Sequence, residues 1–201
     1  MTPATRNEVR IIGGAWRGRK LRFPPDVPGL RPTPDRVRET LFNWLRDEVP
    51  GSRCLDLYAG SGALGFEALS RGAREVVFVD RDPRVAQSLA ATLAAFGSCA
   101  GIVRRADAQA FLQAPGEPFD IVFLDPPFDA GVLPALVAAI DARASVRPGG
   151  LVYLEAPANE GAPPLPPGWR LHRSKRAGEV GYHLARTGGA GGIAPADPAR
   201  S

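Results

Sequence analysis

Asp125, Pro126, Pro127 and Phe128 follow one another at the end of an apolar run. That run, residues 119–124, predicts a buried strand, and in open α/β sheets ligands bind at the carboxyl ends of the strands. The Asp125 carboxylate and the Pro126 carbonyl oxygen can accept hydrogens from an amine on a flat ring, and Phe128 can stack on the ring face. We therefore predict Asp125, Pro126 and Phe128 as catalytic residues. The alternative is a simple turn, because Asp-Pro commonly begins one.

A glycine-rich loop provides a second candidate site. Gly60, Gly62 and Gly65 match G-x-G-x-x-G between a predicted strand and a predicted helix. Glycines let the backbone turn tightly and come close to a cofactor, and an acid about 20 residues later can bind ribose hydroxyls. Asp80 has that position. On this pattern alone, a nicotinamide dinucleotide and S-adenosylmethionine are both suitable, and glycines that serve only helix packing are the alternative.

Two further acids favour S-adenosylmethionine. Asp56 precedes the loop, where it would repel a pyrophosphate but can accept hydrogen bonds from a cationic amino-acid group, directly or through water. Asp107 follows the next predicted strand and can reach an adenine amine. Acids at strand ends also cap helices, which is the alternative for Asp80 and Asp107 and the expected role of Asp82. The predicted donor-binding residues are Asp56, Ala59, Gly60, Gly62, Asp80, Arg81, Asp107, Ala108 and Asp125.

Strands and helices are predicted to alternate around these residues. The predicted strands are 53–58, 75–80, 101–105, 119–124 and 149–155, and the predicted helices are 63–71, 83–96, 107–113 and 131–143. Such alternation is typical of an α/β fold with a parallel sheet and right-handed crossovers. Residues 169–175 and 180–185, with a turn at 176–179, predict a closing antiparallel hairpin. The expected sheet is therefore mostly parallel and has seven strands.

The amino-terminal part of the chain is strongly basic. Between Arg6 and Arg38 there are nine Arg or Lys residues and three acids, which favours an anionic partner. Basic segments on both sides of a Gly-Gly break predict a β-hairpin. We predict nucleic-acid contacts from Arg10, Trp16, Arg17, Arg19, Lys20, Arg22 and Arg36. The alternative is a solvated hairpin in which Trp16 covers the core, and Arg36 or Arg38 can instead pair with Asp35 or Glu39.

The chain divides into three predicted parts. Residues 1–33 form the basic arm and a Pro/Gly loop, residues 34–186 the α/β domain, and residues 187–201, rich in Gly, Ala and Pro, a disordered tail. Thr33 is the predicted N-cap of the first helix, with Pro34 as its first residue. Lys175 and Arg176, at the tip of the closing hairpin, are further candidates for contacts with a polyanion.

The composition excludes several classes of protein. Two Cys and two His residues, without metal-ligand spacing, predict neither a metal site nor a disulfide framework, and they favour the reducing cytoplasm. No apolar run approaches about 18 residues, and the amino terminus lacks the apolar segment of a signal peptide, so no membrane association is expected. We expect a single globular monomer.

Four segments resemble the bacterial RsmD family. They are residues Arg10–Leu21, Leu30–Leu45, Asp56–Ala73 and Asp125–Phe128, within a resemblance that extends to Arg186. The glycine loop is common to many methyltransferases, whereas the first two segments are far more specific. The resemblance implies a Rossmann-like class I methyltransferase fold with S-adenosylmethionine as donor. It also implies methylation of N2 of a guanine in 16S ribosomal RNA, in the small ribosomal subunit or its assembly intermediate.

Other functions stay open at this point. A methyltransferase for adenine N6 or for a protein glutamine can use the same acid-Pro-Pro-aromatic arrangement, and only the resemblance favours guanine N2. A non-enzymatic ribosome-assembly factor that keeps the donor site is a second alternative, and a hydride-transfer enzyme is a third. Cys54 begins a predicted buried strand and Cys99 lies in a predicted loop, which disfavours covalent attack by a cysteine.

Overall fold

Strands and helices alternate along most of the chain. The computed structural model describes residues 7–27, 30, 32–127 and 131–188. Its strands are β1 (Glu8–Arg10), β2 (Lys20–Arg22), β3 (Arg53–Leu57), β4 (Glu75–Asp80), β5 (Gly101–Arg105), β6 (Phe119–Leu124), β7 (Val146–Pro157), β8 (Arg170–Ala177) and β9 (Val180–Arg186). Its helices are α1 (Asp35–Trp44), α2 (Ala63–Ser70), α3 (Pro83–Phe96), α4 (Ala108–Gln113) and α5 (Leu133–Ala142).

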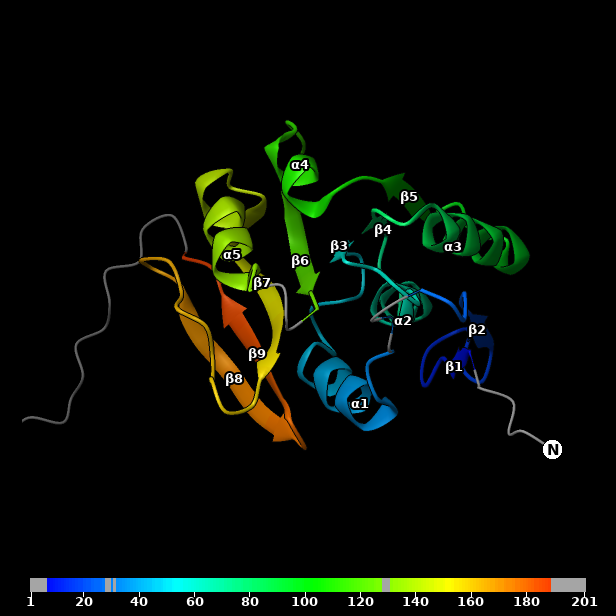
Figure 1. Cartoon of the computed structure of the whole chain (residues 1–201), viewed down its shortest axis with the longest axis horizontal. Helices are drawn as coiled ribbons and strands as arrows, with labels where there is room; N and C mark the ends of the chain where they lie inside the picture. The colour runs from blue at the N-terminus through cyan, green and yellow to red at the C-terminus, as the bar shows by residue number, and fades with distance from the viewer. Residues whose placement is uncertain (1–6, 28–29, 31, 128–130, 189–201) are drawn as a thin grey trace, which may run out of the picture.

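A central seven-stranded sheet has the strand order β5-β4-β3-β6-β7-β9-β8 (Figure 1). The five strands from β3 to β7 run parallel to one another. Strand β9 is antiparallel to both of its neighbours, β7 and β8. Strands β1 and β2 form a separate antiparallel hairpin. The predicted α/β fold, with its parallel sheet, closing hairpin and basic amino-terminal hairpin, is confirmed.

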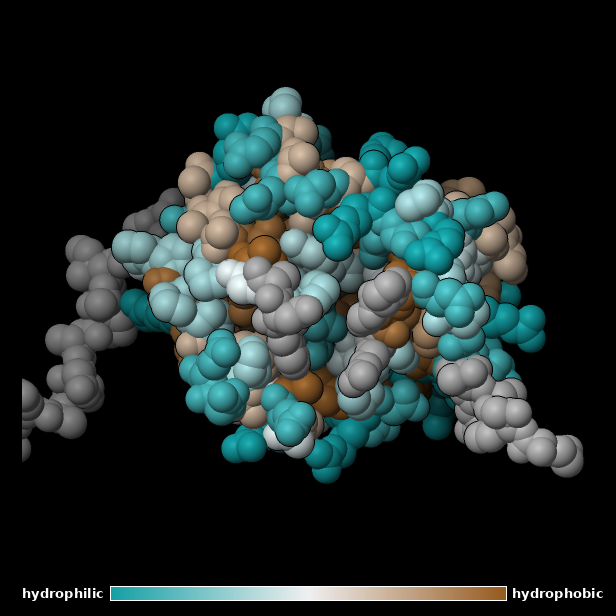
Figure 2. Space-filling model, viewed as in Figure 1, coloured by the Kyte–Doolittle hydropathy of each residue, from teal (hydrophilic) through white to brown (hydrophobic). Residues whose placement is uncertain are grey.

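Helices cover both faces of the sheet and bury two apolar cores. Residues of α1, α2, α3 and the amino-terminal hairpin pack on one face, and residues of α4 and α5 pack on the other (Figure 1). Full burial of a large apolar side chain stabilises a fold by about 1.5–3 kcal/mol, and both cores hold many such residues. Figure 2 shows hydrophilic residues over most of the face in view, with hydrophobic residues mainly in its recesses.

The structure corrects the predicted start of the first helix. Pro34, not Thr33, is the N-cap of α1, and no side chain caps this helix. The carbonyl oxygen of Pro34 accepts hydrogen bonds from the backbone N–H groups of Val37 and Arg38. The Thr33 hydroxyl instead donates to Asp125 Oδ2 over 3.4 Å. Its side chain therefore binds a residue at the carboxyl end of β6 and does not cap the helix.

The end of the closing hairpin also differs from the prediction. Arg176 and Ala177 belong to β8, where they pair with Gly181 and Val180. The turn is therefore shorter than the predicted 176–179. Thr187, assigned to the tail by sequence, is buried, and its backbone N–H donates to the Gly150 carbonyl oxygen over 2.9 Å.

A buried guanidinium joins three distant segments. Arg38 of α1 is fully buried, and it donates to Glu67 of α2, to the carbonyl oxygen of Arg10 and to the carbonyl oxygen of Thr33. It also pairs with Asp35 over 2.6 Å, as the sequence suggested for one of the two arginines of α1. Because a buried charge is stable only when it is paired and hydrogen-bonded, these contacts fix all three segments together.

The amino-terminal hairpin is docked on the second helix. The backbone N–H of Ile12 donates to Glu67 Oε2 over 2.9 Å, and the backbone N–H of Trp16 donates to Ser70 Oγ over 2.9 Å. The Ser70 hydroxyl in turn donates to the Gly13 carbonyl oxygen over 2.5 Å. The hairpin is thus bound to α2 by hydrogen bonds as well as by apolar packing.

Two negative findings apply to the residues that the structure describes. None of their helices combines the length and the apolar character needed to cross a membrane. In the same residues, no cluster of three or more His, Cys, Asp or Glu side chains is arranged to bind a metal ion.

Replacing Arg38 by Ala is expected to destabilise the fold by about 3–5 kcal/mol, because the buried Glu67 carboxylate would lose one of its two guanidinium partners. Urea unfolding followed by circular dichroism measures this loss. Arg36→Ala, an exposed position on the same helix, is the matched control and should change stability by less than about 0.5 kcal/mol. Equal effects of the two substitutions would contradict a stabilising role for the buried pair.

Candidate active site

Three of the predicted acids share one face and one edge of the sheet. Asp56 of β3 pairs with Phe78 of β4 and with Phe123 of β6. Asp80 and Asp125 each come two residues after the phenylalanine of their own strand. Side chains two residues apart in a strand lie on the same face, so the carboxyl ends of these strands bring the acids together.

Glu155 extends this group on the next strand. Leu124 of β6 pairs with Leu154 of β7, and Asp125 and Glu155 come next on the two strands. Their backbones are therefore about 4.8 Å apart, the spacing of neighbouring strands. We call Asp56, Asp80, Asp125 and Glu155 the acidic row.

Asp56 is the most deeply buried acid of the row. Its Oδ2 accepts a hydrogen bond from the Gly65 backbone N–H over 2.8 Å. Burial raises the pKa of Asp56 to about 8, with smaller contributions from the negative charges of Asp125 and Asp80, and the Gly65 hydrogen bond opposes this rise. A nearby cation would favour the ionised form, so this carboxyl group suits a positively charged ligand.

The glycines of the loop have different structural roles. Gly62, the N-cap of α2, has a φ of 74°, and a Cβ atom there would collide with Leu89 and Phe66. A Cβ atom on Gly65 would collide with the ring of Phe78, which is the packing role considered from sequence. A Cβ atom on Gly60 would meet nothing closer than 3.8 Å, so the loop leaves room for a ligand at this glycine.

The backbone around Gly60 is fixed by Asp80. Asp80 accepts hydrogen bonds from the backbone N–H of Gly60 over 3.0 Å and from that of Asp82 over 2.9 Å. Just before the loop, Tyr58 has a φ of 67°, a left-handed conformation that is rare outside glycine. Strained residues of this kind gather at functional sites.

The remaining predicted donor-binding residues surround this loop. Asp107 is the N-cap of α4 and accepts from the Ala110 backbone N–H over 3.1 Å, so its capping role is observed. Its ligand role stays a prediction, as do those of the buried Ala59 and Ala108 and of the exposed Arg81.

Asp125 and Glu155 form a pair of acids held by two hydroxyl groups. The Tyr153 hydroxyl donates to Glu155 Oε1 over 2.6 Å, and the Thr33 hydroxyl donates to Asp125. Burial raises the pKa of Asp125 to about 6, opposed by the Thr33 hydrogen bond. Burial and the charge of Asp125 raise the pKa of Glu155 to about 8. The pair can therefore hold a proton near neutral pH.

A cavity of about 300 Å³ lies beside this pair. Pro126, Pro127 and Glu155 line one part of it, and residues of the β7–β8 loop, including Glu160 and Pro164, line another. Its volume is at the lower end of the range for small-molecule sites, about 300–1,000 Å³. The predicted catalytic Pro126 thus borders a space large enough for a planar ring, whereas Phe128 lies outside the described residues.

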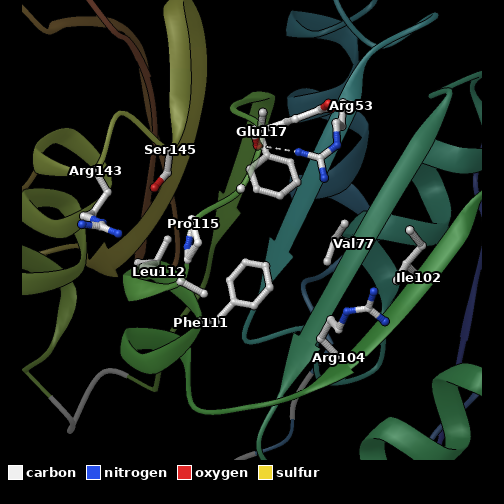
Figure 3. Close-up of a pocket in the computed structure, with 13 residues that line it drawn as sticks. Arg53, Val77, Ile102, Arg104, Phe111, Leu112, Pro115, Glu117, Arg143 and Ser145 are labelled. Carbon is white, nitrogen blue, oxygen red and sulfur yellow. Dashed lines mark hydrogen bonds between the residues drawn. The ribbon is translucent and has the colours of Figure 1, made fainter.

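A larger cavity, of about 440 Å³, is lined by Arg53 and Phe119, the first residues of β3 and β6, and so lies near the amino ends of these strands. Figure 3 shows Phe111 of α4 within it, with Arg104 and Arg143 on either side in the view. Arg53 donates to the carbonyl oxygen of Glu117 over 2.6 Å, which fixes one wall. None of the predicted catalytic or donor-binding residues lines this cavity.

The predicted nucleic-acid-binding residues differ in their exposure and in their contacts with other side chains. Trp16 packs edge-on against Phe96, with ring centroids 5.0 Å apart, so it covers the core as the alternative suggested. The Arg19 guanidinium lies over the Phe96 ring, 3.6 Å from its centroid. Lys20 forms an ion pair with Glu8. The side chains of four others, Arg10, Arg17, Arg22 and Arg36, are exposed and form no ion pair with a described residue.

The chain matches known proteins along nearly all of its folded length. The profile of a family described as "Conserved hypothetical protein 95" matches residues 9–186. The ribosomal RNA small subunit methyltransferase D of Escherichia coli K12 is 47% identical over 177 residues, covering 88% of this chain and 89% of the relative. The chain belongs to the RsmD family. All the residues that carried the sequence resemblance lie within the matched range.

Solved structures support the fold of this RsmD-family chain. A putative methyltransferase, yhhF, from Escherichia coli superimposes with a TM-score of 0.83 at 43% identity, covering 90% of this chain and 98% of that one. The 16S rRNA N2 G1207 methyltransferase RsmC of Thermus thermophilus, solved with AdoMet and guanosine, has a TM-score of 0.67 at 26% identity. That similarity covers 90% of this chain and 49% of the RsmC chain.

Sequence reasoning missed several residues of this candidate site. Glu155 ends the predicted apolar strand 149–155, and the same position at a strand end is what makes Asp80 a candidate. From sequence, strand 149–155 serves as evidence for the fold and not for the site. Tyr153 has no such signal, because a Tyr in an apolar run predicts only core packing. The contact between Arg38 and Glu67 joins residues 29 positions apart and has no local pattern.

Proposed function

We propose that this RsmD-family protein transfers a methyl group from S-adenosylmethionine to N2 of a guanine in 16S ribosomal RNA. The observation that carries this proposal is the position of Asp125 and Pro126, at the carboxyl edge of the sheet between the glycine loop and the smaller cavity. The names of the relatives and the ligands of the Thermus RsmC structure support it. The substrate is the small ribosomal subunit or its assembly intermediate, and the enzyme acts as a cytoplasmic monomer.

The chain's own residues fit a cationic methyl donor. S-adenosylmethionine, when bound, supplies a methyl group activated by a sulfonium. The open space at Gly60 supports a close approach of the backbone to such a ligand. Asp80, which holds the Gly60 backbone N–H, is the acid that we propose for its ribose hydroxyls. Asp56 has a buried carboxyl group whose ionised form is favoured by a positive charge. Arg81 and Asp107 border the same region from the ends of β4 and β5.

The acceptor chemistry requires an oriented amine rather than a strong nucleophile. The lone pair of an exocyclic amine is delocalised into the ring, so the nitrogen must rehybridise as its bond to the methyl carbon forms and the carbon–sulfur bond breaks. Asp125 and the Pro126 carbonyl oxygen can accept the amine hydrogens and hold the nitrogen in line. N2 then loses one proton, for which the Asp125 carboxylate is the nearest predicted acceptor.

A second basic surface lies on the closing hairpin. Strand β8 carries Arg170, Arg173, Lys175 and Arg176, which are exposed and form no ion pair with a described residue. Tyr182 pairs with both Glu155 and Lys175, so Lys175 is two strands, about 10 Å, from the acidic row. We propose that β8 and the exposed arginines of the arm both contact RNA phosphates. Lysine and arginine also protect edge strands from aggregation, so the role of β8 needs a direct test.

Mapping the methylated nucleotide tests the proposed function. The protein is incubated with labelled S-adenosylmethionine and small subunits that lack the modification, and nuclease fragments are analysed by mass spectrometry. One N2-methylguanosine in 16S RNA is expected. An N6-methyladenosine would favour the adenine alternative, and donor binding without incorporation would favour an assembly factor.

Asp125→Ala is expected to lower methyl transfer to those subunits by about 100-fold or more, because the amine loses an acceptor that orients it. Initial rates of label incorporation measure this effect. Asp47→Ala changes an exposed acid in the turn after α1. This variant is the control and should retain full activity with the same unfolding midpoint. Near-normal turnover by Asp125→Ala would exclude the assigned role.

Donor affinity is expected to rise with pH between about 6 and 8, by up to about tenfold per pH unit, and then to level off. The pKa of Asp56 in the free protein is about 8, and a cationic ligand favours its ionised form, so binding below pH 8 releases a proton. Calorimetry in two buffers of different ionisation enthalpy measures that release. Asp56→Asn should bind more weakly and with a flatter pH profile, whereas a wild-type affinity independent of pH would contradict this account.

Neutralising two arginines of the arm, Arg17→Gln with Arg22→Gln, should reduce the salt slope of RNA binding by about 0.7–0.9 per lost phosphate contact. The same loss is expected for Arg173→Gln with Lys175→Gln on β8. Binding to small subunits is measured between low and moderate salt, with Arg74→Gln, exposed near the other edge of the sheet, as the control. An unchanged slope in either double variant would remove that surface from the RNA interface.

A further inference from the structure

Glu155 is a buried acid at the wall of the smaller cavity. The methyl-transfer step described above does not require this residue. The residue is only 4% exposed, yet it lines the cavity together with Pro126 and Pro127. It stands beside Asp125 on the neighbouring strand. A carboxyl group is rarely buried without partners, and the Tyr153 and Thr33 hydroxyls together supply donors for only part of the hydrogen-bonding capacity of Glu155.

Guanine carries two adjacent donors on its Watson–Crick edge, N1–H and the N2 amine. A carboxylate accepts both at once, in the bidentate manner that makes carboxylates and amides selective for bases. Adenine has an acceptor at N1, which would face the carboxylate with a lone pair. A carboxylate at this edge therefore separates guanine from adenine, which Asp125 and Pro126 alone do not do, because both accept hydrogens from any exocyclic amine.

We propose that Glu155, in its ionised form, recognises the target guanine by accepting hydrogen bonds from its N1–H and from one hydrogen of N2. The proton that Asp125 and Glu155 hold in the free protein leaves to solvent when the base binds. This inference rests on the proposed function, and it names the residue that selects guanine. The other hydrogen of N2 goes to Asp125 or to the Pro126 carbonyl oxygen, so the two neighbouring acids hold the amine from two sides. Glu155 contacts the base and fixes its identity, whereas Asp125 orients the reacting nitrogen.

Tyr153 is the positioning residue for Glu155. It lies two residues earlier on β7, on the same face, and its hydroxyl holds Oε1 over 2.6 Å. With Oε1 held in this way, the rotation of the carboxyl group is restricted. A preorganised acceptor of this kind loses less conformational entropy when it binds the base.

The test uses small subunits reconstituted with 2-aminopurine in place of the mapped guanine. 2-Aminopurine keeps the N2 amine but has an acceptor at N1, so the wild-type enzyme should prefer guanine by about 10–100-fold in kcat/KM, the discrimination typical of a bidentate pair. In Glu155→Gln the amide offers a donor where the carboxylate offered an acceptor. This variant should lose guanine activity by a similar factor, and its preference should disappear or reverse towards 2-aminopurine.

Glu117→Gln makes the same chemical change on an exposed residue near the opposite edge of the sheet and is the matched control. Reduced activity of Glu155→Gln with an unchanged guanine preference would overturn the inference, because a merely structural acid would lower both rates together. Inactivity of the wild-type enzyme on guanine subunits would overturn the proposed function itself, and with it this inference. Tyr153→Phe should weaken the preference for guanine while leaving donor affinity unchanged.

Discussion

The buried contact between Arg38 and Glu67 determines where the parts of the site lie. Arg38 also holds the carbonyl oxygens of Arg10 and Thr33, and Glu67 also holds the Ile12 backbone. One ion pair therefore positions the arm, the loop before α1 and the helix that follows the glycine loop. Thr33 reaches Asp125 because its own carbonyl oxygen is held by this arginine. The residues proposed for the substrate and those proposed for the donor are thus linked through the same buried charges.

A second constraint is electrostatic. Asp56, Asp80, Asp125 and Glu155 lie at one edge of four neighbouring strands, and three of them have raised pKa values. Several carboxylates cannot all be ionised in a buried space without compensation, because their mutual repulsion is poorly screened there. Protonation, hydroxyl donors or a cationic ligand must relieve the repulsion. The same arrangement that is unfavourable for four carboxylates by themselves therefore favours a sulfonium and a set of amine hydrogens.

Local patterns predicted the strands, most of the helices and three acids of the row. Asp80 and Asp125 end or follow an apolar run, and Asp56 lies within one just before the glycine loop. The strand of each acid and its position near the carboxyl end could therefore be inferred without knowing the fold. The residues that lie beside these acids in the sheet could not be inferred in this way. The pairing of Leu124 with Leu154, for example, joins strands about 30 residues apart in sequence. Glu155 became a partner of Asp125 only through that register. Thr33 was assigned to the helix because capping is a local rule, whereas its contact with Asp125 spans 92 positions.

The docking of the arm has a consequence for synthesis of the chain on the ribosome. The arm leaves the ribosome before α2, because its partners Glu67 and Ser70 come 55 and 54 residues after the arm residues that they bind. Its basic hairpin therefore stays undocked until α2 has emerged, and closing so long a loop carries an entropic cost before any contact compensates it. Attachment of the arm therefore has to follow the synthesis of α2, and until then a nascent chain exposes its basic hairpin close to the ribosomal RNA of the particle that makes it.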